Sequence, residues 1–288
     1  MKQFSSEELA KLWKPKADSQ GEDNGQVTII GGSELFSGAP LLSLVAAARV
    51  VDMVYLATPE TDKGAAEKTA IFSRLKSVIW VPREDLDRYI EKSDAVLIGS
   101  GMMRFTKEGS SEQDLKNRNL DKSGQETRQI TKILLQNFPE KKWVIDGGSL
   151  QVMEREWIPP KAVLTPNKEE YEMLFNEQFT LNNLQLNALK YNCVIVHKGN
   201  AGYVTDGMET YEINGGNAGL TKGGTGDTLA GLTVGLLAKN PALSAAAAAS
   251  YVVKRTVDSL FEKAGYNYNA DDVAENVFRV MKKLTDGI

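Results

Sequence analysis

Short apolar segments rich in valine and isoleucine recur along the chain, and glycine, proline or charged residues bound each of them. Segments of this kind are typical of strands that are buried on both faces of a sheet. We therefore predict strands in the segments VTIIGG from Val27, DMVYLAT from Asp52, SVIWVP from Ser77, DAVLIGSG from Asp94, KWVIDGG from Lys142, KAVLTPN from Lys161 and CVIVHKG from Cys193.

Segments with helical spacing of apolar residues lie between most of these strands, at 40–51, 84–92, 125–137 and 181–191. This alternation predicts parallel strands joined by right-handed crossovers, with helices on both faces of the sheet. The later segment YVTDGMETYEI carries an Asp-Gly turn between two β-prone arms, which predicts a hairpin. We therefore expect an α/β protein with three layers, whose mostly parallel sheet has an antiparallel hairpin at one edge.

The chain from Thr225 onward is predicted to be mostly helical. In the run from 240 to 264, Asn240 is expected to cap a helix whose first turn holds Pro241. Gly265 is the expected C-terminal stop of this helix.

The domain organisation is predicted from the polar stretches. Residues 1–26, with a helix over 6–13, are expected to form an N-terminal helical appendage to a single catalytic domain of residues 27–288. The segment 106–124 is polar and poor in apolar residues, which predicts a mobile surface loop within that domain.

Charge and hydropathy exclude several classes of function. Lys and Arg number 34 against 38 Asp and Glu, so the net charge of −4 provides no basic surface for nucleic acid or an anionic membrane. The N-terminus has no apolar core of signal-peptide length, and no later stretch reaches the ~20 apolar residues of a membrane span. We expect a cytoplasmic protein whose partner is a small molecule.

Two residue types occur once each. Cys193 alone cannot form an intrachain disulfide or a site of several cysteines, which suits a reducing compartment. His197 is the single histidine, so a Ser-His-Asp triad or a zinc site would have to be built around it. Its place in the apolar run CVIVHKG favours a strand-end residue over a catalytic one.

The most informative segment for chemistry is GGNAGLTKGGTGDTLAGLTVGLLAK, from Gly215 to Lys239. The residues from 223 to 226 lead directly into an apolar stretch with helical spacing. Their backbone amides are therefore expected to form an anion site at a helix N-terminus. Asp227 follows directly, where its carboxylate can accept a proton from a hydroxyl that attacks phosphorus. Asp227 could instead only cap the helix, but four small residues ahead of it exceed what a cap requires, which favours a catalytic base.

Three further sites allow two interpretations each. Gly31, Gly32, Gly38 and Ala39 could only shape a turn, but a glycine-rich loop after the first buried strand is also where an open α/β sheet binds its ligand. Asn167 could cap the helix KEEYEMLF or contact a substrate. Lys198 could reach a nucleotide phosphate or only solvent.

Several of these motifs resemble, in the same order, those of the ribokinase-like superfamily and, within it, the NAD(P)H-hydrate dehydratases. GNAGLTKGGTGD is similar to the family pattern GNPGMATGGTGD, and IIGGSELFSGAP to its first Gly-Ser loop, which ends in Gly-Ala. LIGSGMM, VIDGG, LTPNKEE and KGNAG stand where the family has GPGLG, DAD, TPHxGE and KGxxT. The resemblance extends from Val27 to the last helix, and it implies a ribokinase-like three-layer fold.

The resemblance also implies roles for individual residues, with Asp227 as the catalytic base. The residues implied to bind the substrate are Gly38, Ala39, Gly101, Asn167 and Asp227. Those implied to bind the nucleotide are Lys198, Gly199, Asn200, Ala201, Gly202, Gly223, Gly224, Thr225 and Gly226. Met103, Gly148, Asn167 and Gly202 depart from the family pattern.

The function that the resemblance implies is the nucleotide-dependent dehydration of hydrated NADH or NADPH, with ADP or ATP as phosphate donor, Mg²⁺ as cofactor and a homo-oligomer as the assembly. Phosphorylation of the added hydroxyl would turn it into a good leaving group. Two alternatives remain at this point. One is an ATP-dependent kinase of a small alcohol, such as a vitamin precursor or sugar, and the other is a nucleotide-binding regulator without catalysis.

Overall fold

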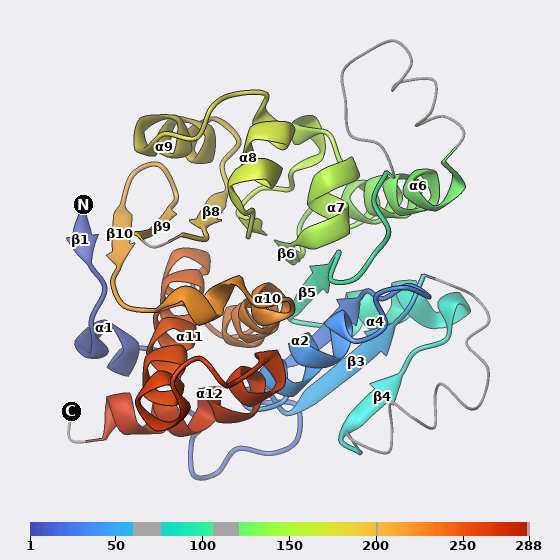
Figure 1. The fold of residues 1–288 in the computed structure, drawn as a ribbon. Helices are drawn as coiled ribbons and strands as arrows, with labels where there is room; N and C mark the ends of the chain where they lie inside the picture. Colours follow the sequence, from blue (N-terminus) through green and yellow to red (C-terminus); the bar gives the residue numbers. More distant parts are fainter. Residues whose placement is uncertain (60–75, 106–120, 200, 287–288) are drawn as a thin grey trace.

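The computed structural model describes residues 1–59, 76–105, 121–199 and 201–286. The strands of these residues form one sheet in the order β1-β10-β9-β8-β7-β6-β5-β2-β3-β4 (Figure 1). Their bounds are β1 Lys2–Gln3, β2 Gln26–Ile30, β3 Met53–Ala57, β4 Val78–Trp80, β5 Ala95–Ile98, β6 Lys142–Ile145, β7 Val163–Leu164, β8 Val194–His197, β9 Gly202–Thr205 and β10 Thr210–Ile213.

Neighbouring strands are parallel except where β9 pairs antiparallel with β8 and with β10. The chain runs outward from β2 through β3 to β4 and then returns to β5 on the other side of β2. Val27 of β2 accordingly pairs with Val54 of β3 on one side and with Ala95 of β5 on the other. Open α/β sheets bind ligands at such a switch point, outside the carboxyl ends of the strands.

Helices cover both faces of the sheet (Figure 1). On one face lie α1 Ser6–Ala10, α2 Ala39–Ala47, α10 Thr225–Leu237, α11 Ala242–Ala264 and α12 Ala270–Thr285. On the other lie α4 Leu86–Lys92, α6 Lys122–Asn137, α7 Gly147–Val152, α8 Lys168–Phe175 and α9 Leu181–Lys190. Short 3₁₀ turns are η1 Arg83–Asp85, η2 Arg155–Trp157 and η3 Ala218–Thr221.

The strands contribute alternate residues to two apolar cores, one on each face. In β5, Ala95 and Leu97 pack with the core that contains α10, whereas Val96 and Ile98 pack with the opposite core. This follows from the two-residue period of a strand, and it explains why the strands of a doubly covered sheet are continuously apolar.

Two glycines of α10 allow this helix to pack closely against α2. A Cβ on Gly231 would lie 2.2 Å from the carbonyl oxygen of Ser43, and a Cβ on Gly235 would lie 2.5 Å from Cγ2 of Val50. The Ser43 hydroxyl also donates a 2.8 Å hydrogen bond to the carbonyl of Asp227. The close packing therefore fixes the N-terminus of α10 relative to the loop that precedes α2.

The structure confirms the predicted α/β fold, with each predicted strand present and the hairpin formed by β9 and β10. The prediction for Asn240 was wrong, because Pro241 is the N-cap of α11. The Asn240 side chain instead donates to the carbonyl of Leu236 at 2.8 Å and accepts from the amide of Trp13 at 2.8 Å. Gly265 ends the helix as expected.

The polar segment predicted as a mobile loop falls mostly outside the described residues, and its last part, Lys122–Gly124, belongs to α6. The N-terminal region adds β1, which pairs parallel with β10 and was not predicted. Leu9 of α1 is buried in the apolar core on the α10 face. The domain boundary after residue 26 stays a prediction. In the described part of the chain, no helix combines the length and the hydropathy needed to cross a membrane.

Candidate active site

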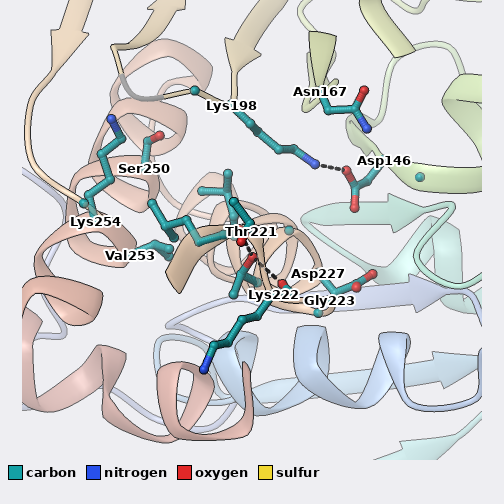
Figure 2. A pocket seen from close by; sticks show the side chains of 18 of the residues that line it. Asp146, Asn167, Lys198, Thr221, Lys222, Gly223, Asp227, Ser250, Val253 and Lys254 are labelled. Atoms are coloured by element: carbon teal, nitrogen blue, oxygen red, sulfur yellow. Dashed lines mark hydrogen bonds and ion pairs between the residues drawn. The ribbon is translucent and has the colours of Figure 1, made fainter. Parts of the chain in front are cut away.

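A cavity of about 600 Å³ opens at the carboxyl ends of the central strands, beside the N-terminus of α10. The lining residues come from the segments that follow β2, β5, β6, β7 and β8, from the segment before α10 and from one face of α11 (Figure 2). They include Phe36, Ala39, Gly101, Asp146, Asn167, Glu170, His197, Lys198, Leu220, Gly223, Gly224, Thr225, Gly226, Asp227, Ser250, Val253 and Lys254. This is the position that the strand order predicts for a ligand site.

The loops after β5 and β6 interlock, because glycines replace side chains where their backbones meet. A Cβ on Gly99, which has φ +116°, would lie 1.8 Å from the carbonyl oxygen of Asp146. A Cβ on Gly148 would lie 2.2 Å from the carbonyl oxygen of Met102. Gly148, one of the departures from the family pattern, thus fits the backbone of the neighbouring loop, where any side chain would collide with it. The interlock brings Gly101 and Asp146 to one wall of the cavity.

Asp146 and Lys198 form an ion pair inside the cavity (Figure 2). Lys198 Nζ donates to Asp146 Oδ1 at 2.8 Å, and the hydroxyl of Thr165 donates to the same oxygen at 2.7 Å. Burial opposes the charge on Lys198, but the carboxylates of Asp146 and Glu170 outweigh it and raise the lysine pKa. The ammonium also lies close to α10, since a Cβ on Gly226 would be 3.2 Å from Nζ.

The segment Gly223–Gly226 forms the start of α10 as predicted. Gly224 is the N-cap with φ +94°, a left-handed conformation that favours glycine. The Thr225 hydroxyl donates to the carbonyls of Leu220 at 2.8 Å and of Lys222 at 3.0 Å, which holds the preceding turn in place. The first-turn amides of a helix lack intrahelical partners and carry the positive end of its dipole, so this turn provides a site for anions.

Asp227 lies in the first turn of α10, directly after these amides. Burial and, after it, the nearby carboxylate of Asp146 raise the pKa of Asp227 to about 7. Lys198 and a hydrogen bond with the side chain of Ser100 act in the opposite direction. A carboxyl group with a pKa near neutrality can take up and release a proton at physiological pH, as a general base requires.

Asn167 caps a helix and also lines the cavity, and its contact with a substrate stays a prediction. Its side-chain oxygen accepts a 2.9 Å hydrogen bond from the amide of Glu170, and the Glu170 carboxylate accepts one of 2.8 Å from the amide of Asn167. These bonds form a capping box at the start of α8. Asn167 also lines the cavity, and Figure 2 shows its side-chain nitrogen on the side of the Lys198–Asp146 pair.

The structure brings most of the sequence-predicted residues to this one cavity. They are Ala39, Gly101, Asn167, Lys198, Gly199, Gly223, Gly224, Thr225, Gly226 and Asp227. Among the described residues, Gly38, Ala201 and Gly202 do not line it, and Asn200 lies outside the described residues. Gly38 is exposed and precedes α2, and Gly202 is buried as the first residue of β9.

Sequence reasoning did not assign several residues that line the cavity. Asp146 was noted within VIDGG but received no role, although a carboxylate after a buried strand is a usable signal. Glu170 appeared only as part of a helix. Ser250, Val253 and Lys254 project from α11. No motif of adjacent residues marks this wall, because Lys254 is followed directly by Arg255 in an ordinary amphipathic helix.

His197 ends β8 and its ring packs in the cavity wall. The imidazole stacks on Phe179 with ring centroids 3.6 Å apart. Burial lowers the pKa of His197, which favours the neutral ring. This placement agrees with the prediction of a strand-end residue.

Comparisons with known proteins add the family to this geometry. The sequence profile of NAD(P)H-hydrate dehydratases matches residues 27–279. The chain is 30% identical over 284 residues to the bifunctional NAD(P)H-hydrate repair enzyme Nnr of Methanocaldococcus jannaschii, covering 96% of this chain and 52% of that protein. It is 29% identical over 279 residues to the ADP-dependent (S)-NAD(P)H-hydrate dehydratase of Enterococcus faecalis, covering 93% and 88%.

The fold comparison agrees with the sequence comparison. A solved ribokinase-like superfamily protein from Enterococcus faecalis superposes with a TM-score of 0.80 at 25% identity, covering 98% of this chain and 96% of that one. The chain spans about half the length of the bifunctional relatives that it matches. The profile match, the strand order and the glycine-rich start of α10 agree, and the chain belongs to the NAD(P)H-hydrate dehydratase family, with a ribokinase-like fold.

Proposed function

We propose that this protein restores NADH or NADPH from the hydrated form of the dinucleotide, with ADP or ATP as phosphate donor. The observation that supports this most directly is the placement of Asp227, whose pKa is raised to about 7 beside the anion site at the start of α10. A proton acceptor next to a phosphate site is the arrangement needed to transfer a phosphoryl group to a hydroxyl.

The first step is phosphorylation of the hydroxyl that hydration added to the nicotinamide ring. The hydroxyl oxygen forms a bond to the terminal phosphorus of the nucleotide, and the bond from that phosphorus to the bridging oxygen breaks. Asp227 takes the hydroxyl proton. The amides of the first turn of α10 and the ammonium of Lys198 stabilise the negative charge on the transferring group.

The second step expels the phosphate. The lone pair of the ring nitrogen forms a double bond to the carbon that carries the phosphate ester, and the carbon–oxygen bond breaks. Loss of a proton from the adjacent ring carbon then restores the dihydronicotinamide. Phosphate leaves far more readily than hydroxide, so the nucleotide supplies the driving force for the dehydration.

Mg²⁺ fits this site as a cation that arrives with the nucleotide. Mg²⁺ in nucleotide sites is held by phosphate oxygens, water and one or two carboxylates. The described residues contain no group of three or more His, Cys, Asp or Glu side chains that could hold a metal, so they provide no protein cage. Asp146 lines the cavity and could complete the coordination of Mg²⁺ while Asp227 takes the hydroxyl proton, and the cation would offset charge on the transferring phosphoryl group.

The test is to incubate the protein with hydrated NADH and with ADP or ATP, and to follow both the absorbance of reduced nicotinamide and the release of inorganic phosphate. We expect NADH and phosphate to appear together in equal amounts, and only when a nucleotide is present. A stable phosphorylated product would instead identify a kinase of a small alcohol. Nucleotide binding without any turnover would identify a regulator. The homo-oligomer and the cytoplasmic location remain predictions.

A further inference from the structure

The cavity contains a buried lysine at the end far from Asp227. Lys254, on α11, is 5% exposed and its Nζ donates a 2.8 Å hydrogen bond to the carbonyl of Ile213 at the end of β10. Burial lowers the pKa of Lys254, and Asp258 acts against this effect. The side chain also lines the wall of the cavity.

The Lys254 side chain fills a space that two glycines leave open. A Cβ on Gly202 would lie 3.0 Å from Nζ of Lys254 and 3.1 Å from its Cε. A Cβ on Gly216 would lie 3.1 Å from its Cγ. Gly202 stands where the nucleotide loop of the family has threonine, so in this chain the ammonium of Lys254 occupies the space beside that loop position.

The residues at the two ends of the cavity determine which way a bound nucleotide would lie along it. Asp227 shares a hydrogen bond with Ser100, next to Gly101, and a Cβ on Gly101 would lie 2.9 Å from Cβ of Ala39, so both residues lie at the Asp227 end of the cavity. Asn167 lies on the same side, beside the Lys198–Asp146 pair (Figure 2), and the hydroxyl acceptor must bind at this end. Figure 2 shows Ser250 and Lys254 on the opposite side of the cavity from Asp146 and Asp227. A nucleotide whose terminal phosphate lies beside Asp227 therefore extends its nucleoside toward α11, where the apolar side chains of Leu220 and Val253 also line the wall.

We infer that Lys254 is a specificity-determining residue for the nucleoside of the phosphate donor, and that its ammonium donates a hydrogen bond to the base or the ribose. This inference rests on the proposed use of a nucleotide at this site. An ammonium has donors and no acceptor. Lys254 therefore recognises a ring nitrogen, a carbonyl or a hydroxyl oxygen, and it selects against a nucleoside that presents an amino group there.

The experiment compares ligands with and without a nucleoside by titration calorimetry in the presence of Mg²⁺. Lys254→Met keeps the length and apolar stem of the side chain, and we expect it to weaken ATP binding about tenfold while inorganic tripolyphosphate binds within twofold of the parent. An unchanged ATP affinity would overturn the inference. An equal loss for ATP and tripolyphosphate would also overturn it, because the lysine would then bind phosphate. With 2′-deoxy-ATP, a smaller effect of the substitution would place the contact on the ribose, and an equal effect would place it on the base.

Lys142 provides a matched control. Lys142 is more exposed than Lys254, but desolvation also lowers its pKa, and its Nζ also donates to backbone carbonyls, those of Leu237 and Ala238 at 3.1 Å. It begins β6 and so lies at the opposite end of the strands from the cavity. Lys142→Met should leave the ATP affinity within twofold, which separates loss of a lysine that is bonded to backbone carbonyls from loss of a ligand contact.

Gly202→Thr tests the same contact from the other side. The added Cβ must displace the ammonium, so this variant should also bind ATP about tenfold more weakly. Both substitutions would remove the same contact, so the double variant Gly202→Thr with Lys254→Met should bind ATP within threefold of either single variant. A double variant whose loss is the product of the two single losses would contradict a shared contact. These experiments measure the affinity for ATP and do not depend on dehydration of hydrated NADH. If the protein bound ATP without dehydrating hydrated NADH, the proposed function would be refuted, whereas the contact of Lys254 with the nucleoside would still be tested.

Discussion

The two ends of the cavity differ in how they are built and in what they can do. At the Asp227 end, loops after several strands bring Asp146, Glu170 and Lys198 around the first turn of α10. Burial raises the pKa values of Asp227 and Glu170, whereas the neighbouring carboxylates outweigh burial and raise the pKa of Lys198. At the other end, one face of α11 presents Ser250, Val253 and a single buried ammonium. The first end is suited to moving a proton, and the second is suited to recognising the rest of a ligand.

The largest effect is expected at the Asp227 end. Asp227→Asn keeps the size of the side chain and its ability to cap α10, but it removes the proton acceptor. We expect turnover of hydrated NADH to fall by ~10²-fold or more while nucleotide binding persists. Steady-state kinetics together with calorimetry test this, and near-normal turnover in the variant would refute the role of Asp227.

The same substitution should stabilise the fold in a pH-dependent way. The pKa of Asp227 is about 7 in the folded protein, whereas an unfolded Asp has a pKa of about 4. The protonated carboxyl therefore contributes stability that is present at low pH and is lost as the pH rises to about 7. Asn has no proton to lose at this position.

Consequently, the free energy of unfolding of Asp227→Asn relative to the parent should increase between pH 5 and pH 8, by about 2 kcal/mol. Denaturant titrations of the ligand-free proteins at several pH values measure this difference. A difference that stays constant over that range would mean that the Asp227 carboxylate is ionised throughout.

Two glycines at the start of α10 should respond differently to substitution. A Cβ on Gly226 meets only the flexible end of Lys198 within 4 Å, so Gly226→Val should fold but weaken nucleotide binding about tenfold by blocking the phosphate. Gly224 has φ +94°, and a Cβ there would lie 2.3 Å from Cδ1 of Leu42, so Gly224→Ala should lower the stability by about 2 kcal/mol.

Calorimetry for the nucleotide and thermal unfolding for stability separate the two glycines. If Gly226→Val bound the nucleotide with unchanged affinity, the phosphate would have to lie elsewhere in the cavity.

The smallest effects are expected at Asn167, where capping and ligand contact can be separated. Asn167→His should leave the dehydration rate within about tenfold, because neutral His also offers one donor and one acceptor. Asn167→Leu should raise KM for the hydrated dinucleotide more than for the nucleotide. Asn167→Ser keeps an N-cap for α8, so it should reproduce the KM effect of Asn167→Leu at a lower cost in stability.

KM values for both substrates, measured alongside thermal unfolding, distinguish these cases. A loss of equal size for both substrates would indicate general damage to the cavity. An unaltered KM in both Asn167→Leu and Asn167→Ser would mean that Asn167 is a helix cap alone.

The contrast between the two ends also explains what could be predicted from sequence. The Asp227 end follows from local patterns, since the apolar strands place their carboxyl ends together and a glycine-rich segment before a helix specifies an anion site. The role of Asn167 as a cap was likewise visible in the spacing of Asn167 and Glu170. These features depend on residues that lie close together in the sequence.

The Lys254 end could not be predicted, because it depends on which helix face packs beside the hairpin. The space for the ammonium is created by Gly202 and Gly216, which are 52 and 38 residues away in the chain. The pKa of Asp227 also depends on Asp146 and Lys198, which follow two other strands. The prediction for Asn240 failed for a similar reason, because contacts with Leu236 and Trp13 outweigh its local capping tendency.

In the proposed reaction, phosphate leaves with the oxygen of the added hydroxyl, and isotope labelling of that oxygen tests this step. Hydrated NADH prepared with ¹⁸O in that hydroxyl would be converted by the protein with unlabelled ATP, and the released phosphate would be analysed by mass spectrometry. We expect one ¹⁸O atom in inorganic phosphate for each NADH restored. Label found in water, with unlabelled phosphate, would show that the hydroxyl leaves without being phosphorylated and would refute the proposed reaction.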